Sequence, residues 1–298
     1  MKVLAYFDLF DYPLSKEEIL AFLDQAVRME NLSEALNELR AEKYIFLYRD
    51  YYMIQDNDGL VTRRIKGNDR AKPLLRTGNR ISRFLYQMPY VRAIGISGSL
   101  SKDFAGEGAD IDYFIITKSN RLWVARTIMH LFKKWSFLFG RQHWYCMNYY
   151  IDEDALEIEE KNIFTAIELI TLLPVRGNGV LHAFFDKNEW TNWFYPNYRL
   201  KIKDADILSG DSKWKRSIES LFNTRLGDWL DNYFMQVTSR RWSKKEEKQK
   251  LSVKGTRMGL QTGKHFSRPN PAFFQKEILS LYNDKLNALS AKWDTDLL

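Results

Sequence analysis

The stretch SGSLSKDFAGEGADIDYFIIT, residues 97–117, decides how this chain is organised and raises its main chemical question. It follows the apolar segment VRAIGIS (91–97) and leads into a second apolar segment, which opens with Asp110 and Asp112. An ionised carboxylate is costly to remove from water unless a cation compensates it. We therefore expect the two aspartates to hold metal ions where a buried strand begins.

The spacing of the two aspartates suits a pair of metal ions. Side chains two positions apart on a strand share a face and lie ~6.6 Å apart along it. Both can then bind ions ~3.5–4 Å apart, the separation found in two-metal phosphoryl-transfer sites. Carboxylate oxygens are also the hard ligands that Mg²⁺ prefers.

The Asp-x-Asp pattern alone decides little, because it occurs five times in the chain. The pair at 110 differs from the others in its surroundings, since a buried strand and a Gly-Ser pair precede it and a buried strand continues from it. The five pairs are Asp56/Asp58, Asp110/Asp112, Asp152/Asp154, Asp204/Asp206 and Asp294/Asp296.

The order of these residues resembles the signature of the DNA polymerase beta-like nucleotidyltransferase superfamily. The match consists of Ile96-Ser97-Gly98-Ser99, ten intervening residues, and then Asp110-Ile111-Asp112-Tyr113. It covers about residues 90–200. The resemblance implies an enzyme that transfers a nucleoside monophosphate from an NTP to an acceptor and releases pyrophosphate, with two Mg²⁺ ions on Asp110 and Asp112.

The resemblance also implies how the nucleotide is bound. Gly98 lets the backbone approach the triphosphate, and amides at the start of the next helical turn donate to phosphate oxygens. Ser99 is expected to bind a terminal phosphate. Lys102, one turn further on, would neutralise the leaving pyrophosphate.

The family usually adds a third carboxylate from a later strand. The predicted strand CMNYYI (146–151) contains no acid, and Asp152 follows directly after it. We take Asp152 as the candidate third catalytic carboxylate. Glu168, which interrupts an apolar helix, could instead point into the site as a base, or it could be a satisfied, partly buried carboxylate.

The whole chain predicts an α+β protein with several parts. We expect a winged-helix-like domain at residues 1–58, a basic connecting helix at 59–89, a small mixed-sheet nucleotidyltransferase domain at 90–205 and a helical C-terminal domain at 206–298. The first part is predicted to contain helices near 4–8, 16–27 and 31–44, followed by a hairpin around Arg49 and Asp50. Its third helix could contact DNA, but it carries at least as many acids as bases, so we favour docking or dimerisation.

Composition sets outer limits on function. The chain has 298 residues, of which 45% are hydrophobic, and a net charge of +7, which suits acidic partners such as nucleotides. Its one cysteine, Cys146, excludes an intramolecular disulfide and a cysteine-rich zinc site. The first residues lack a signal-peptide pattern, and no apolar run approaches the ~20 residues that span a bilayer. We therefore expect a cytoplasmic protein without membrane contact.

Three functions fit the sequence. The first is a nucleotidyltransferase with a small-molecule acceptor, because no compact basic groove with interleaved aromatics is evident for a long nucleic acid. The second is a catalytically weak regulatory protein that senses nucleotide and binds DNA or a partner through residues 1–58. The third is transfer of a nucleotide onto a protein. The aromatic group Trp190, Trp193, Phe194 and Tyr195 could stack a nucleobase, although core packing is the more common use of such residues.

Overall fold

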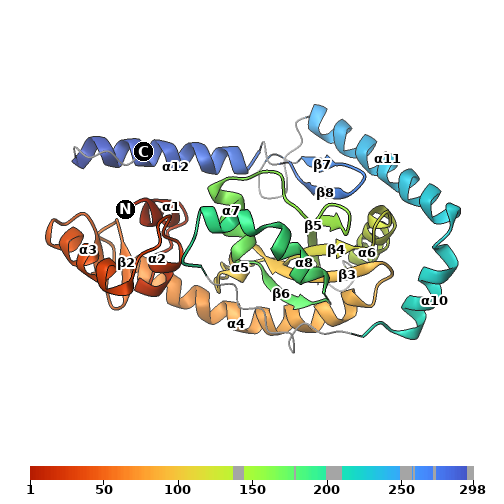
Figure 1. Ribbon diagram of the computed structural model, residues 1–298, viewed down its shortest axis with the longest axis horizontal. Helices are drawn as coiled ribbons and strands as arrows, with labels where there is room; N and C mark the ends of the chain where they lie inside the picture. Colours follow the sequence, from red (N-terminus) through yellow and green to blue (C-terminus); the bar gives the residue numbers. More distant parts are fainter. Residues whose placement is uncertain are drawn as a thin grey trace.

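One six-stranded mixed sheet forms the centre of the computed structural model, with helices on both of its faces (Figure 1). The structure describes residues 1–136, 144–177, 179–198, 210–248, 257, 259–270 and 273–293. The strands are ordered β6-β3-β4-β5-β8-β7, and of the neighbouring pairs only β4 and β5 are parallel. The α+β class with a mixed sheet is as predicted. The strands are β3 (Val91–Ser97), β4 (Asp112–Thr117), β5 (Cys146–Asp152), β6 (Leu173–Arg176), β7 (Leu260–Thr262) and β8 (Phe266–Pro269).

The side-chain alternation of β4 determines which face of the sheet carries Asp112. Tyr113 and Ile115 pack in the core that α4 (Gly59–Tyr86) and α6 (Leu122–Ser136) share with the sheet. Phe114 and Ile116 pack in the opposite core, with α7 (Ile163–Ile170) and α8 (Val180–Lys187). Successive strand residues point to opposite faces, so Asp112 faces α7.

The N-terminal part contains the predicted three helices and hairpin. Ser15 and Glu18 form the expected capping box at the start of the second helix. That helix ends at Ala21 rather than Val27, because Asn197 holds the following segment by accepting from the Val27 amide and donating to the Gln25 carbonyl. The elements are α1 (Lys2–Asp8), α2 (Lys16–Ala21), α3 (Met29–Ala41), β1 (Phe46–Tyr48) and β2 (Tyr51–Met53).

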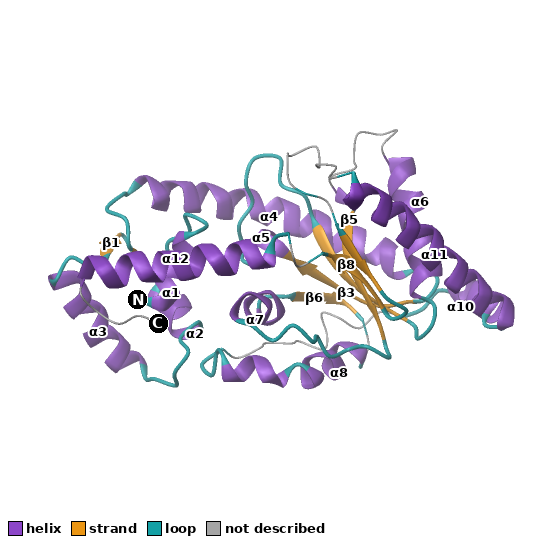
Figure 2. Ribbon diagram, turned by 90° about the horizontal axis from the view of Figure 1, so that it is seen from above, coloured by secondary structure: helices purple, strands orange, loops and turns teal. Residues whose placement is uncertain are grey.

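The C-terminal part is not wholly helical, which corrects the sequence-based expectation for residues 206–298. It contains α10 (Lys213–Phe222), α11 (Arg225–Glu247) and α12 (Gln275–Trp293), but β7 and β8 lie between them. The short strand β8 pairs with β5, so this hairpin extends the central sheet (Figure 2). Its three- and four-residue strands are too short to give a clear alternation pattern in the sequence.

The last helix returns to the first (Figure 1). On α12, Leu286 and Leu289 pack against Ala5 of α1. The Tyr282 hydroxyl donates to the Lys2 carbonyl at 3.4 Å, and Lys285 forms an ion pair with Asp8. Across the described ranges, none of the helices is at once long enough and apolar enough to cross a membrane.

Candidate functional site

Gly98 and Asp112 meet where β3 ends and β4 begins. The antiparallel register pairs Ser97 with Asp112, and the chain turns at Gly98 directly into the short helix α5 (Gly98–Ser101). Gly98 has φ +71°, a conformation that side-chain-bearing residues rarely adopt. A Cβ added there would lie 3.0 Å from Asp112 Oδ2. The position therefore needs glycine both for its backbone conformation and for the approach of the carboxylate.

Asp112 is a perturbed carboxylate. Its pKa is raised to about 6, mainly by burial and also by the charges of Asp110 and Glu168. A hydrogen bond from the Cys146 side chain and the charge of Lys133 act in the opposite direction. A carboxylate with a shifted pKa beside other acids is typical of functional sites, and a bound cation would favour its ionised form.

Asp110 lies two residues before Asp112, where the strand begins slightly later than predicted. The ladder nevertheless extends one residue further, because the Cys146 amide donates to the Ile111 carbonyl at 3.2 Å. Ile111 is fully buried on the α4 side, and Asp110 is half-buried and acts on Asp112 through its charge. Asp110 is thus within electrostatic range of Asp112, whereas the shared strand face that the spacing predicts stays a prediction, because Asp110 lies before the strand.

Lys102 and Glu168 complete this end of the sheet. Lys102 Nζ lies 2.7 Å from Glu168 Oε1, and it donates to the Gly98 carbonyl at 3.2 Å. Glu168 comes from α7, the helix that Asp112 faces. Its only sequence signal is that an acid interrupts an apolar helix. Glu168 is therefore the additional carboxylate near Asp112.

Asp152 lies at the other end of β5, which corrects its choice as the third carboxylate of this site. The parallel register pairs Asp112 with Cys146 and Thr117 with Asp152, so five residues of strand, about 17 Å, separate the two aspartates. Asp152 is fully buried there and is already satisfied. It accepts from the Asn120 and Asp154 amides, each at 3.0 Å, and lies 2.9 Å from His265 Nδ1.

The group around Asp152 has the composition of a metal site. The ligand atoms of Asp152, Asp154 and His265 lie within 4.8 Å of one another. Asp154 also accepts from the Ser119 hydroxyl at 2.8 Å and from the Asn120 side-chain amide at 3.2 Å. These bonds tie the loop after β4 to the end of β5, which explains the cluster without an ion.

Two cavities meet at Asp112, and each has its own chemistry. The Lys102 cavity, ≈ 590 Å³, lies between the N-terminal helices and the site, and Ser99, Lys102 and Arg63 contribute to its wall. The Arg268 cavity, ≈ 420 Å³, lies between α7 and the sheet, and Arg268, Glu160 and Tyr149 contribute to its wall. The residues that line both are Gly98, Asp112, Phe164, Glu168 and Phe274.

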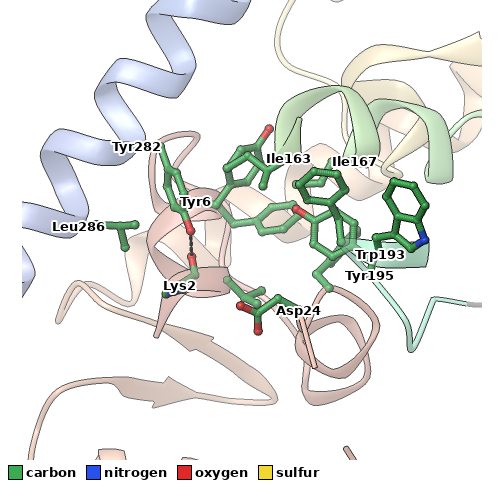
Figure 3. Close-up of a pocket in the computed structure, with 13 residues that line it drawn as sticks. Lys2, Tyr6, Asp24, Ile163, Ile167, Trp193, Tyr195, Tyr282 and Leu286 are labelled. Atoms are coloured by element: carbon green, nitrogen blue, oxygen red, sulfur yellow. Dashed lines mark hydrogen bonds between the residues drawn. The ribbon is translucent and has the colours of Figure 1, made fainter. Parts of the chain in front are cut away.

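The aromatic residues around 190–195 are not part of this site. Trp190 and Tyr195 are buried, whereas Trp193 is 77% exposed. Trp193 and Tyr195 line a third cavity of ≈ 250 Å³, where they lie with Tyr6, Ile163 and Ile167 near the contact of Tyr282 with Lys2 (Figure 3). Asp112 and Glu168 do not line this cavity. Of the other Asp-x-Asp pairs, Asp56 and Asp58 lie between β2 and α4, and the pairs at 204 and 294 fall outside the described residues.

Comparisons with known proteins give no relative. No family model matches the chain, and neither a curated protein nor a solved structure matches it. Function must therefore be inferred from the site itself.

Proposed function

We propose that the protein is a Mg²⁺-dependent nucleotidyltransferase that transfers a nucleoside monophosphate from an NTP to a small-molecule acceptor and releases pyrophosphate. The observation that carries this proposal is that Gly98 leaves room for the Asp112 carboxylate in a cavity that Ser99 and Lys102 also line. The resemblance of residues 96–99 and 110–113 to the nucleotidyltransferase signature supports it.

The acidic residues of the site fit Mg²⁺. Asp110 and Asp112 would hold the two ions, because their carboxylates are close enough for the charge of one to raise the pKa of the other. When bound, the ions offset negative charge on the α-phosphate and orient the in-line attack.

The residues of the α5 turn would hold the triphosphate. Gly98 lets its backbone come close to the phosphates, and the Ser99 hydroxyl donates to a phosphate oxygen. Lys102 is bound to Glu168 in the structure. An arriving triphosphate would take over Lys102 and release the Glu168 carboxylate.

Glu168 would then serve as the third carboxylate. It lines both cavities and acts on Asp112 through its charge. From there it can bind a metal ion or accept the proton of the attacking hydroxyl. This role replaces the one that the sequence suggested for Asp152.

The remaining parts of the chain complete the proposal. We assign residues 1–58 to a winged-helix-like domain, 90–205 to the nucleotidyltransferase domain and 206–298 to a C-terminal part that supports both, in a cytoplasmic enzyme. The Tyr12 hydroxyl donates to the Lys102 carbonyl at 2.9 Å, so the first domain also buttresses the nucleotide site. DNA binding through this domain is the less favoured use, because α3 is not basic.

The test is a calorimetric titration of ATP, GTP, CTP and UTP with and without Mg²⁺. We expect at least one nucleotide to bind only with the metal, and the Asp112→Asn variant to weaken that binding by roughly a hundredfold. Asp58→Asn, which changes an aspartate of another Asp-x-Asp pair, is the matched control. Equal affinity in the wild type and Asp112→Asn would refute the site.

A further inference from the structure

In-line transfer gives the two cavities different roles. The attacking and leaving oxygens lie on opposite sides of the α-phosphorus. Arg63, Ser99 and Lys102, which suit phosphates, line the Lys102 cavity and are absent from the described wall of the Arg268 cavity. With the metal ligand Asp112 between the cavities, pyrophosphate departs toward the Lys102 cavity and the acceptor approaches from the Arg268 cavity.

The Arg268 cavity has one cation in its described wall, and that cation is already paired with a carboxylate. Arg268 is 6% exposed and forms a two-pronged ion pair with Glu160, in which Nη1 lies 2.6 Å from Oε2. Its Nε donates to Gln261 Oε1 at 2.9 Å. A bidentate pair of this kind occupies the guanidinium edge that would otherwise bind a phosphate or carboxylate.

Among the described residues, the rest of the cavity wall is acidic or uncharged. Asp112 and Glu168 lie at the end shared with the Lys102 cavity. Thr165 and Gln275 are hydrogen-bonded to each other at 3.2 Å, which places neutral polar groups on the wall. An anion brought into this space would lose its hydration beside carboxylates and gain no cation in return. The aromatic residues in the described wall of the Arg268 cavity are Tyr113, Phe114, Tyr149, Phe164 and Phe274.

We propose that the acceptor is an uncharged, hydroxyl-bearing molecule with an apolar face, of the sugar, cyclitol or nucleoside kind, bound in the Arg268 cavity. Glu160 excludes anionic acceptors by occupying Arg268. This inference rests on the proposed function. In the step itself the acceptor oxygen bonds to the α-phosphorus and its proton passes to Glu168. The bond to the bridging oxygen breaks, and pyrophosphate leaves with that electron pair.

The first experiment compares matched acceptors that differ by one phosphate. Pyrophosphate release from the Mg²⁺-nucleotide is measured with inositol, glucose and adenosine, each against its phosphate monoester. We expect at least one neutral member to raise the rate roughly tenfold more than its phosphorylated partner. Equal or greater stimulation by the phosphorylated partners, or none by any neutral member, would overturn the inference.

The second experiment frees the Arg268 guanidinium. Glu160→Gln removes the charge that occupies it, and we expect the preference for neutral acceptors to fall by roughly tenfold. The double variant Glu160→Gln with Arg268→Gln is the matched control and should keep the wild-type preference. A wild-type preference in Glu160→Gln would show that the ion pair does not set acceptor charge.

Measurements of nucleotide binding distinguish a failure of the proposed function from a failure of the inference about the acceptor. Thermal unfolding and Mg²⁺-nucleotide affinity are measured for every variant, so that a misfolded protein is recognised. A wild type that binds no Mg²⁺-nucleotide would refute the proposed function. Normal nucleotide binding together with a preference for phosphorylated acceptors would refute only the inference about the acceptor.

Discussion

Two effects favour glycine at position 98: the positive φ of its backbone and the close approach of Asp112. A comparison with Gly108 separates the energetic costs of the two effects. Gly108 also has positive φ, +66°, but a Cβ there would meet nothing within 4 Å. We expect Gly108→Ala to cost about 1–2 kcal/mol of unfolding free energy through backbone strain alone.

Gly98→Ala should cost at least ~1 kcal/mol more than Gly108→Ala, because its Cβ would crowd Asp112 Oδ2. It should also abolish Mg²⁺-dependent nucleotide binding, which Gly108→Ala should retain. Urea unfolding and calorimetry measure the two effects. Equal costs for both variants would mean that the carboxylate simply moves aside.

The partly buried carboxylate of Asp112 should make the metal-free protein less stable than a neutral variant at high pH. Its folded pKa of about 6 lies above the ordinary value of 3.8, so its contribution to stability is greatest at low pH and is lost as pH rises through about 6. Without metal at pH 8, Asp112→Asn should be more stable than the wild type by roughly 2–3 kcal/mol.

Added Mg²⁺ and nucleotide should reverse the order of these two proteins, because only the wild type gains stability from binding. Thermal unfolding with and without the ligand checks both halves of the prediction. If Asp112→Asn were less stable than the wild type in both conditions, Asp112 would have a structural role instead.

The proposed role of Glu168 as the third carboxylate can be tested through the effect of its substitution on kcat. Glu168→Gln keeps the shape of the side chain but removes its charge, so we expect kcat to fall by roughly a hundredfold while KM for the nucleotide changes little. Glu159→Gln, an exposed acid in the same part of the chain, is the control. An unchanged kcat for Glu168→Gln would leave the site with two carboxylates.

Residue spacing predicts part of this site and misses the rest for a physical reason. Gly98, Ser99, Asp110 and Asp112 lie in one continuous stretch, so a turn between two adjacent strands brings them together. Glu168 reaches the site from α7, which packs on the face of the sheet opposite α6, and no local pattern encodes that contact. The prediction for Asp152 was wrong because β4 and β5 are parallel. Asp112 therefore lies beside Cys146, the first residue of β5, and Asp152 is the last residue of that strand.

Some helices and strands can be predicted from their own sequence, whereas others depend on contacts with distant parts of the chain. The long α4 and the buried strand β3 were predictable because each carries its own pattern over many residues. The strands β6 and β8 have only four residues each and form because a neighbouring strand supplies their hydrogen bonds. Pairing with the neighbouring strand, and not the local sequence pattern, determines where such short strands form.

The helix α6 carries a partly buried histidine that should make the protein sensitive to acid. The pKa of His130 is lowered to about 3, mainly by burial and also by the charges of Arg126, Lys133 and Lys134. A depressed folded pKa means that the stability from the neutral ring is present above the unfolded value of 6.5 and is lost as pH falls.

Between pH 6.5 and 5 this loss should reach about 2 kcal/mol. His130→Gln cannot gain a proton, so its unfolding free energy should fall less over this range by the same amount. Urea unfolding at several pH values measures the difference, and Asp112 contributes equally to both proteins. If the unfolding free energies of the two proteins changed in parallel with pH, the lowered pKa of His130 would be contradicted.

At the scale of the whole molecule, the two ends of the chain jointly shape the candidate site. Tyr6 and Phe7 of α1 line the Lys102 cavity, and Tyr12 is bonded to Lys102. The position of α1 depends in turn on α12, which packs across it. The N-terminal part is thus a wall of the site, and the C-terminal helix fixes that wall in place.

This dependence can be tested with two leucines on α12. Leu286 is buried against α1, whereas Leu281 is 47% exposed. Leu286→Ala should cost about 2–4 kcal/mol of unfolding free energy, and Leu281→Ala less than ~0.5 kcal/mol. Because a loosened α1 leaves the Lys102 cavity incomplete, Leu286→Ala should also weaken Mg²⁺-nucleotide binding by roughly tenfold at a temperature where it remains folded. A destabilised Leu286→Ala with wild-type nucleotide affinity would show that the N-terminal wall contributes to the fold and not to the site.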